Sequence, residues 1–113
     1  MDLPGLQAEV ERGLGLADDE LRSFFRSVRC VPRKWQLHPW GDEGGGFWVV
    51  ATHRERALWF NDIEDGFNVS SFDRAGRIPS DQYRCNQDEM HLALRLLRDG
   101  QGIRLGPPRP VDA

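Results

Sequence analysis

Five carboxylates flank a pair of predicted β-strands in this 113-residue chain. Residues 47–52 and 57–60 are rich in aromatic and β-branched side chains, which favour strands, and the short segment between them fits a hairpin turn. An antiparallel hairpin brings the residues before its first strand and those after its second strand to the same end. The carboxylates gathered there are Asp42, Glu43, Asp62, Glu64 and Asp65. Clustered like charges repel unless a cation, intramolecular arginines or a basic partner offsets them, so this end is the first candidate binding site.

The same carboxylates support an alternative function, a small metal-assisted or acid–base enzyme. A pair such as Glu43 and Asp62 has the residue types of a general acid and a general base. Residues 61–66 resemble a calcium-binding loop, but Ile63 stands at a ligand position and Phe72 stands where the bidentate acid belongs, which excludes an EF-hand. The sequence also contains no zinc-protease, nucleophile-elbow or phosphate-loop motif. No catalytic residue, metal ligand or cofactor is therefore predicted.

Period-two alternation divides the predicted hairpin into two faces. With the turn centred on residues 54–55, the register pairs Val50 with Trp59. One face is wholly apolar and is predicted to be core; it carries Phe47, Val49, Ala51, Leu58 and Phe60. The other face carries Trp48, Val50 and Trp59. Either a helix or the strand around Trp35 covers this second face, or part of it stays open to bind a partner, because exposed aromatic patches mark interaction sites.

Two helices are predicted before the strands. Residues 3–14 place apolar side chains at helical spacing, with Gly13 and Gly15 as stops. The second helix has Asp18 as its N-cap and an apolar stripe within residues 21–28. Both helices are short and need a surface to pack on.

After the hairpin, the pattern predicts a third strand at 67–73, an irregular segment with a short edge strand at 82–84, and a final helix. Asn86 is expected to cap this helix, with Glu89 completing a capping box, and Gly100 is expected to end it. The order of elements predicts an α+β domain. Its core is an antiparallel β-meander of three to five strands packed with two N-terminal helices and one C-terminal helix.

Length and cysteine content indicate the domain organisation and the compartment. The chain fits one domain, expected at residues 1–105, followed by a Pro-rich flexible tail at 106–113. Cys30 and Cys85 have no partner at metal-binding spacing, and no signal peptide precedes them. We therefore expect a cytoplasmic protein with two free, buried thiols, either a monomer or a homodimer.

The charge pattern indicates the class of partner. A net charge of −3 disfavours nucleic acid as a partner, because binding to phosphates usually needs a basic excess. The basic residues, all arginines except Lys34, are interleaved with acids rather than gathered in one patch. No apolar run approaches the roughly 20 residues that a membrane span needs. The expected partner is therefore a protein, with neither nucleic acid nor membrane involved.

The segment WFNDIEDGFNVS at 59–70, with the later run CNQDE at 85–89, resembles a pattern in small bacterial proteins of unassigned function. Some proteins of that size and type are immunity proteins of secreted toxins, so the resemblance implies a toxin inhibitor. Small acidic inhibitors bind their targets through charged and aromatic patches. The predicted function is a protein-binding module that contacts a basic toxin domain through Trp48, Trp59 and the five carboxylates.

Overall fold

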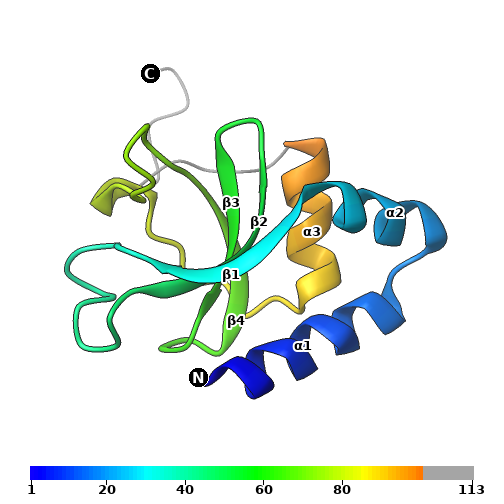
Figure 1. Ribbon diagram of the computed structural model, residues 1–113, viewed down its shortest axis with the longest axis horizontal. Helices are drawn as coiled ribbons and strands as arrows, with labels where there is room; N and C mark the ends of the chain where they lie inside the picture. The colour runs from blue at the N-terminus through cyan, green and yellow to red at the C-terminus, as the bar shows by residue number, and fades with distance from the viewer. Residues whose placement is uncertain (101–113) are drawn as a thin grey trace.

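The computed structural model describes residues 1–100 of the chain, in which two helices precede four strands and one further helix (Figure 1). The elements are α1 Leu3–Leu16, α2 Asp19–Val28, β1 Arg29–Trp35, β2 Phe47–His53, β3 Arg56–Asn61, β4 Gly66–Ser71, the 3-10 helix η1 Ser80–Gln82, and α3 Met90–Asp99. This order confirms the predicted α+β fold class, with two N-terminal helices and one C-terminal helix. The predicted tail at 106–113 and the end of the predicted domain at 101–105 lie outside the described residues.

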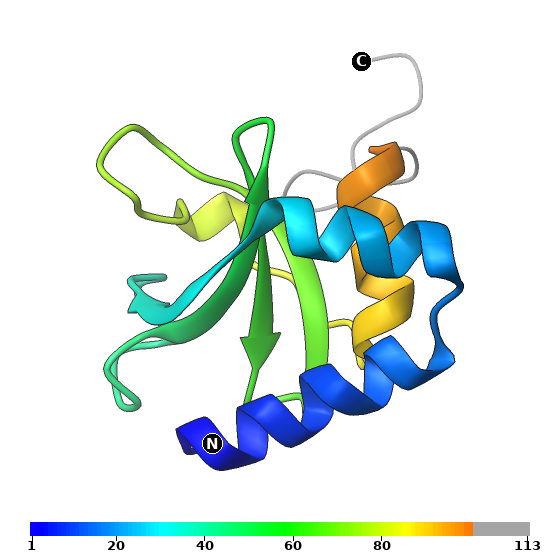
Figure 2. The same cartoon turned by 45° about the vertical axis from the view of Figure 1, so that its right-hand side comes forward.

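The sheet is an antiparallel meander in the order β1-β2-β3-β4, so strands that follow one another in sequence are neighbours in space. Figure 2 shows the three helices on one side of this sheet. The α3 helix contacts β2, β3 and β4, and both α1 and α2 pack against α3. The main core therefore lies between the sheet and α3, with the two N-terminal helices closing it.

The predicted start of α2 is correct, whereas the predicted glycine stops of α1 are wrong. Asp18 caps α2, because its Oδ1 accepts a hydrogen bond from the backbone N–H of Leu21 at 2.8 Å, which confirms the prediction. Gly13 and Gly15, predicted as stops, both lie inside α1. A Cβ built on Gly13 would lie 2.5 Å from the Cβ of Met90. The absence of a side chain at Gly13 thus serves the close crossing of α1 and α3 rather than ending the helix.

The last helix begins later than predicted. Its N-cap is Glu89 and not Asn86, while Gly100 ends the helix in the left-handed conformation, as predicted. The residues before Glu89 run beside β4, where the Phe67 N–H donates to the Asp88 carbonyl oxygen at 2.8 Å. Pairing with the sheet therefore holds residues 86–88 extended.

Within residues 1–100, no helix combines the length and the apolar character needed to cross a membrane.

The register of β2 against β3 changes at Val50. Near the turn the pairing is as predicted, but Trp59 pairs with Val49 and not with Val50, which is the extra residue of a β-bulge. Because successive side chains point to opposite faces, the bulge turns Trp48 to the face that the helices cover, while Trp59 stays on the opposite face, as alternation along β3 requires. The prediction that Trp48 and Trp59 share a face is therefore wrong. Phe47 and Val49 are buried in the core as predicted, but on the opposite face from Ala51, Leu58 and Phe60.

Residues 72–88 cover the second face of the sheet around Trp59, which is 0% exposed, so of the two alternatives for this face, covered or partly open, the covered one holds at Trp59. Within this segment, η1 and extended backbone replace the edge strand predicted at 82–84. The Trp59 Nε1–H donates to the Ser70 Oγ at 3.0 Å, and that hydroxyl in turn donates to the Gln82 carbonyl oxygen. Buried polar groups thus fasten the covering segment to the strands.

The two cysteines are free thiols in different surroundings. Cys30 on β1 is partly buried, with its Sγ 3.9 Å from the Val49 carbonyl oxygen. Cys85 is exposed, so the prediction that both thiols are buried is wrong for this residue. It lies within the covering segment, which has a solvent-facing side.

Candidate functional site

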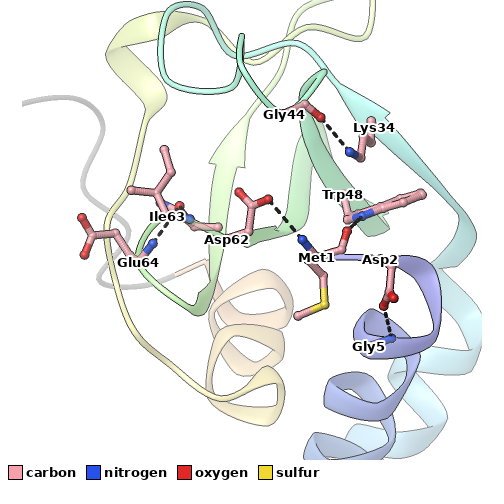
Figure 3. Close-up of polar contacts among 10 residues, drawn as sticks. Met1, Asp2, Gly5, Lys34, Gly44, Trp48, Asp62, Ile63 and Glu64 are labelled. Atoms are coloured by element: carbon pink, nitrogen blue, oxygen red, sulfur yellow. Dashed lines mark hydrogen bonds and ion pairs between the residues drawn. The ribbon is translucent and has the colours of Figure 1, made fainter.

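The predicted acidic site lies on two loops at one end of the β2–β3 hairpin. The first acidic loop, residues 36–46, joins β1 to β2, and the second acidic loop, residues 62–65, joins β3 to β4. A Cβ built on Gly44 would lie 3.8 Å from the Asp62 Oδ2, so the two loops are neighbours (Figure 3). The structure thus brings the predicted carboxylates to one end. Asp42, Glu43, Asp62 and Asp65 are exposed, and Glu64 is half-buried.

Asn61 fixes the conformation of the second acidic loop. Its buried Oδ1 accepts hydrogen bonds from the backbone N–H groups of Ile63 at 3.0 Å and Glu64 at 3.2 Å. Its Nδ2 donates to the Tyr83 hydroxyl and to the Arg84 carbonyl oxygen, both at 2.9 Å. A side-chain oxygen that accepts from the two following backbone amides forms a tight turn. The covering segment therefore sets the position of this loop through Asn61.

The first residue of the chain lies between the second acidic loop and Trp48 (Figure 3). The amino group of Met1 is 3.6 Å from the Asp62 Oδ2, and the Met1 carbonyl oxygen accepts from the Trp48 Nε1–H at 3.0 Å. Lys34 Nζ lies 5.4 Å from the centroid of the Trp48 ring and donates to the Gly44 carbonyl oxygen at 2.6 Å. Trp48 is half-buried, and contacts within the chain already use both its ring face and its N–H.

Among residues 1–100, only some of the carboxylates at this end have an ion-pair or hydrogen-bond partner. Besides the Met1 contact, Asp42 Oδ2 lies 2.7 Å from His38 Nδ1. Glu43, Glu64 and Asp65 form no ion pair with any residue in 1–100. Arginines were one of the predicted sources of compensation, and none within the described part of the chain pairs with these acids. The three carboxylates are therefore available to a basic partner.

Trp59 does not belong to this surface. Its side chain is fully buried, with its ring 4.8 Å from that of Phe47 and its N–H bonded to Ser70. A partner that docks on the folded protein cannot contact it. The assignment of Trp59 as a partner-binding residue is corrected for this reason.

Two apolar residues that the sequence analysis did not assign stand at the acidic end instead. Trp40 is 41% exposed and stacks on Tyr83 with 4.4 Å between the ring centroids, and Ile63 is 56% exposed. Because Tyr83 accepts the hydrogen bond from Asn61, the stacked pair is attached to the start of the second acidic loop. The available signal was an apolar side chain inside each acidic loop. The sequence analysis used Ile63 only as evidence against a calcium site and did not consider Trp40.

The metal-assisted alternative has no ligand set in the described residues. Across residues 1–100, no group of three or more His, Cys, Asp or Glu side chains is arranged to hold a metal ion.

Comparisons with protein-family models, curated proteins and solved structures found no match. The resemblance to immunity proteins therefore rests on the sequence pattern, and the geometry of the acidic end is the basis for a functional proposal.

Proposed function

We propose that this chain is a small protein-binding module whose acidic end binds a basic surface of a partner protein. One observation carries the proposal: Glu43, Glu64 and Asp65 gather on two adjacent loops without an ion-pair partner in residues 1–100. Unpaired carboxylates on neighbouring loops create a negative potential that speeds the approach of a basic partner. Charge alone gives little affinity, so the surface also needs apolar anchors.

Trp40 and Ile63 are the anchors that the acidic end offers. Each projects from one of the acidic loops with a large exposed fraction, 41% for Trp40 and 56% for Ile63. Aromatic and aliphatic side chains at the centre of an interface, surrounded by polar groups, are the usual source of binding energy. Stacking on Tyr83 holds the Trp40 ring in place before binding, which lowers the entropy lost on association.

The finer form of the proposal is that the chain is a bacterial immunity protein that inhibits a basic toxin domain in the cytoplasm. Support comes from the sequence resemblance and from the acidic, aromatic character of the exposed loops. An inhibitor of this kind requires no chemistry of its own, because covering the toxin surface is enough to block it.

Affinity capture with matched charge variants tests the binding proposal. The immobilised protein is exposed to an extract of its native cells as wild type, as Glu43→Lys/Glu64→Lys, and as Glu20→Lys/Glu55→Lys. The last pair makes the same change in net charge at exposed sites on α2 and in the β2–β3 turn. We expect wild type and the control to capture the same basic protein and the first variant to lose it. Capture should also weaken as salt is raised, because exposed charges are screened.

Two outcomes separate the parts of the proposal. If every captured protein binds the Glu43→Lys/Glu64→Lys variant as well as wild type, the acidic end is not the binding surface. If a partner depends on that end but does not arrest growth when expressed alone, or if co-expression of this chain does not relieve the arrest, the protein is a binding module but not an immunity protein.

A further inference from the structure

A cleft of about 420 Å³ lies between α1, α2 and the start of β1, away from the acidic end. Its apolar lining comes mainly from Leu6, Val10, Leu14, Phe25 and Val50, and the polar side chains that line it are those of Gln7, Glu11 and Arg29. The cleft opens where the sheet is irregular: Val50 is the bulged residue of β2, and the β1–β2 pairing skips from Arg29–Ala51 to Arg33–Val49. Pro32 lines the same cleft and has no N–H to continue the ladder. Bulges commonly stand beside binding sites because they redirect the strand.

A second cleft of about 340 Å³ adjoins the first and is lined by three arginines. The two clefts share Leu14, Phe25 and Arg29, so they form one elongated depression with an apolar end and a basic end. The basic end carries Arg22, Arg26 and Arg29. The sequence analysis treated the arginines as interleaved with acids, but residues 21–41 contain no acid, and the fold brings these three together.

The three arginines differ in how far the chain satisfies them. Arg22 is held by Asp19, 2.7 Å away, and by the Leu14 carbonyl oxygen at 2.8 Å. Arg26 and Arg29 are exposed and have no carboxylate within ion-pair distance in residues 1–100. Guanidinium groups bind carboxylate and phosphate oxygens in pairs, with a rigid fork of N–H donors. The basic end therefore offers two unpaired cationic groups beside an apolar surface.

We infer that this depression binds a small amphipathic organic anion, with its apolar chain or ring in the larger cleft and its anionic group between Arg26 and Arg29. The volume of the larger cleft falls within the range of small-molecule sites, which are mostly apolar with a few converging polar groups. This depression carries arginines, whereas the acidic end carries carboxylates, so the two sites would bind ligands of opposite charge. The inference goes beyond the proposed function, since neither site shares a residue with the other.

Titration with a matched set of ten-carbon amphiphiles tests the inference. Decanoate, decyl phosphate, decanol and decyltrimethylammonium are added below micelle-forming concentrations, and binding is followed by calorimetry and by backbone amide NMR shifts. We expect decanoate and decyl phosphate to bind with one-to-one stoichiometry and to shift Leu14, Phe25, Arg29 and Cys30. The phosphate and carboxylate arms identify the preferred anionic group. The alcohol should bind at least about tenfold more weakly and the cation not at all, because one charge-assisted hydrogen bond is worth roughly a factor of ten or more.

Arginine variants locate the anionic group. Arg26→Gln/Arg29→Gln should weaken decanoate binding at least about tenfold. Arg33→Gln/Arg95→Gln removes the same charge at exposed positions outside both clefts and should leave the affinity within about twofold. Circular dichroism and the melting temperature confirm that both variants are folded. If both variants weaken binding equally, the effect is one of net charge, and the site inference is wrong.

Other occupants are also outcomes of this design. If decanol and decanoate bind equally, the depression is an apolar surface without anion recognition, and the inference fails. It also fails if no soluble amphiphile shifts the cleft residues while an acidic peptide or anionic phosphatidylglycerol vesicles do, because the groove would then serve a protein or a membrane.

Discussion

Asn68 and Asn86 hold one another by two hydrogen bonds that join β4 to the covering segment. The Asn86 backbone N–H donates to the Asn68 Oδ1 at 2.8 Å, and the Asn68 Nδ2 donates to the Asn86 carbonyl oxygen at 3.1 Å. A side-chain amide thereby pairs with a backbone amide as a neighbouring strand would. Asn68 is 1% exposed, so these bonds replace contacts that water would otherwise make. The pair explains how a segment with little regular structure stays fixed on the sheet.

Replacing Asn68 by Ala should lower the free energy of unfolding by about 2–3 kcal/mol, because it leaves the Asn86 amide groups without their partner in a partly buried place. Asn86→Ala is the matched control. Asn86 engages Asn68 through its backbone, and its own side chain is exposed, so its loss should cost no more than about 0.5 kcal/mol. Urea denaturation of the two variants measures both values. Equal losses would show that the Asn68 amide does not fasten the segment.

Gly66 tests how closely β4 and the covering segment approach. A Cβ at this position would lie 2.3 Å from the Cα of Gln87, so Gly66→Ala should destabilise the protein by about 1–3 kcal/mol. Gly15→Ala makes the same chemical change in α1, where no atom lies within 4 Å of the added Cβ. Helix propensity predicts a gain of roughly 0.5–1 kcal/mol there. Thermal and chemical unfolding should therefore give opposite signs, and a destabilised Gly15→Ala protein would contradict the open surroundings of that residue.

The β2–β3 turn is strained at two residues. Arg54 and Glu55 have φ angles of 50° and 66°, the left-handed values that a two-residue hairpin turn requires at both centres. Asn-Gly adopts these angles more readily, so Arg54→Asn/Glu55→Gly should raise the free energy of unfolding by about 1 kcal/mol. Ala-Ala at the same positions removes the side chains without relieving the strain and should give no gain. Urea midpoints compare the three proteins, and a less stable Asn-Gly variant would show that the original side chains hold the turn.

The two thiols should differ in reactivity. Burial raises the pKa of Cys30 above its ordinary value of 9.0, so less of the reactive thiolate is present at pH 8. Iodoacetamide should therefore modify the exposed Cys85 first, as followed by peptide mass spectrometry at pH 8. Cys85→Ser isolates the slower reaction at Cys30. Equal modification rates in native wild type would contradict the burial of Cys30.

The raised pKa of the Cys30 thiol also predicts how the stability of the protein depends on pH. Because the pKa of Cys30 is higher in the folded than in the unfolded chain, the folded state retains its proton longer. The stabilising contribution is complete below pH 9 and is lost as the pH rises through the raised value. Cys30→Ser should therefore show a smaller fall in melting temperature than wild type between pH 8.5 and pH 10.5. This range begins below the ordinary value of 9.0 and extends above it. A fall of the same size in both proteins would assign the alkaline loss to other groups.

Local signals predicted the elements better than the way their faces are arranged. The Asp18 cap and the 54–55 turn follow from side-chain chemistry that acts within a few residues, and both are as predicted. The bulge at Val50 had no such signal, because residues 47–51 are all apolar and alternation cannot reveal a shift of one residue. That single shift turned Trp48 to the helix-covered face and Phe47 and Val49 to the other, whereas Trp59 is buried because residues 72–88 cover its face.

At the acidic end, too, some features follow from the sequence and others depend on long-range contacts. The antiparallel pairing of two strands was enough to gather five carboxylates at one end, because strand direction alone decides which loops are neighbours. Which apolar residues accompany them depends on Asn61 and Tyr83, whose contact spans more than twenty positions in sequence. Trp40 stacks on Tyr83 and the Ile63 N–H donates to Asn61, so this long-range contact links the two exposed residues.

The sequence by itself determined the α+β order of elements, the hairpin and the acidic character of its open end, because these depend on propensity, periodicity and strand direction. Only the tertiary structure decided the rest. Long-range contacts buried Trp59 under residues 72–88, occupied Trp48 with Met1 and Lys34, and left Glu43, Glu64 and Asp65 unpaired within the described chain. They also placed an apolar cleft beside Arg22, Arg26 and Arg29, which helical spacing along α2 already brings together. The physical reason is that a side chain's solvation depends on what the fold packs against it, and neighbours in sequence do not specify that packing.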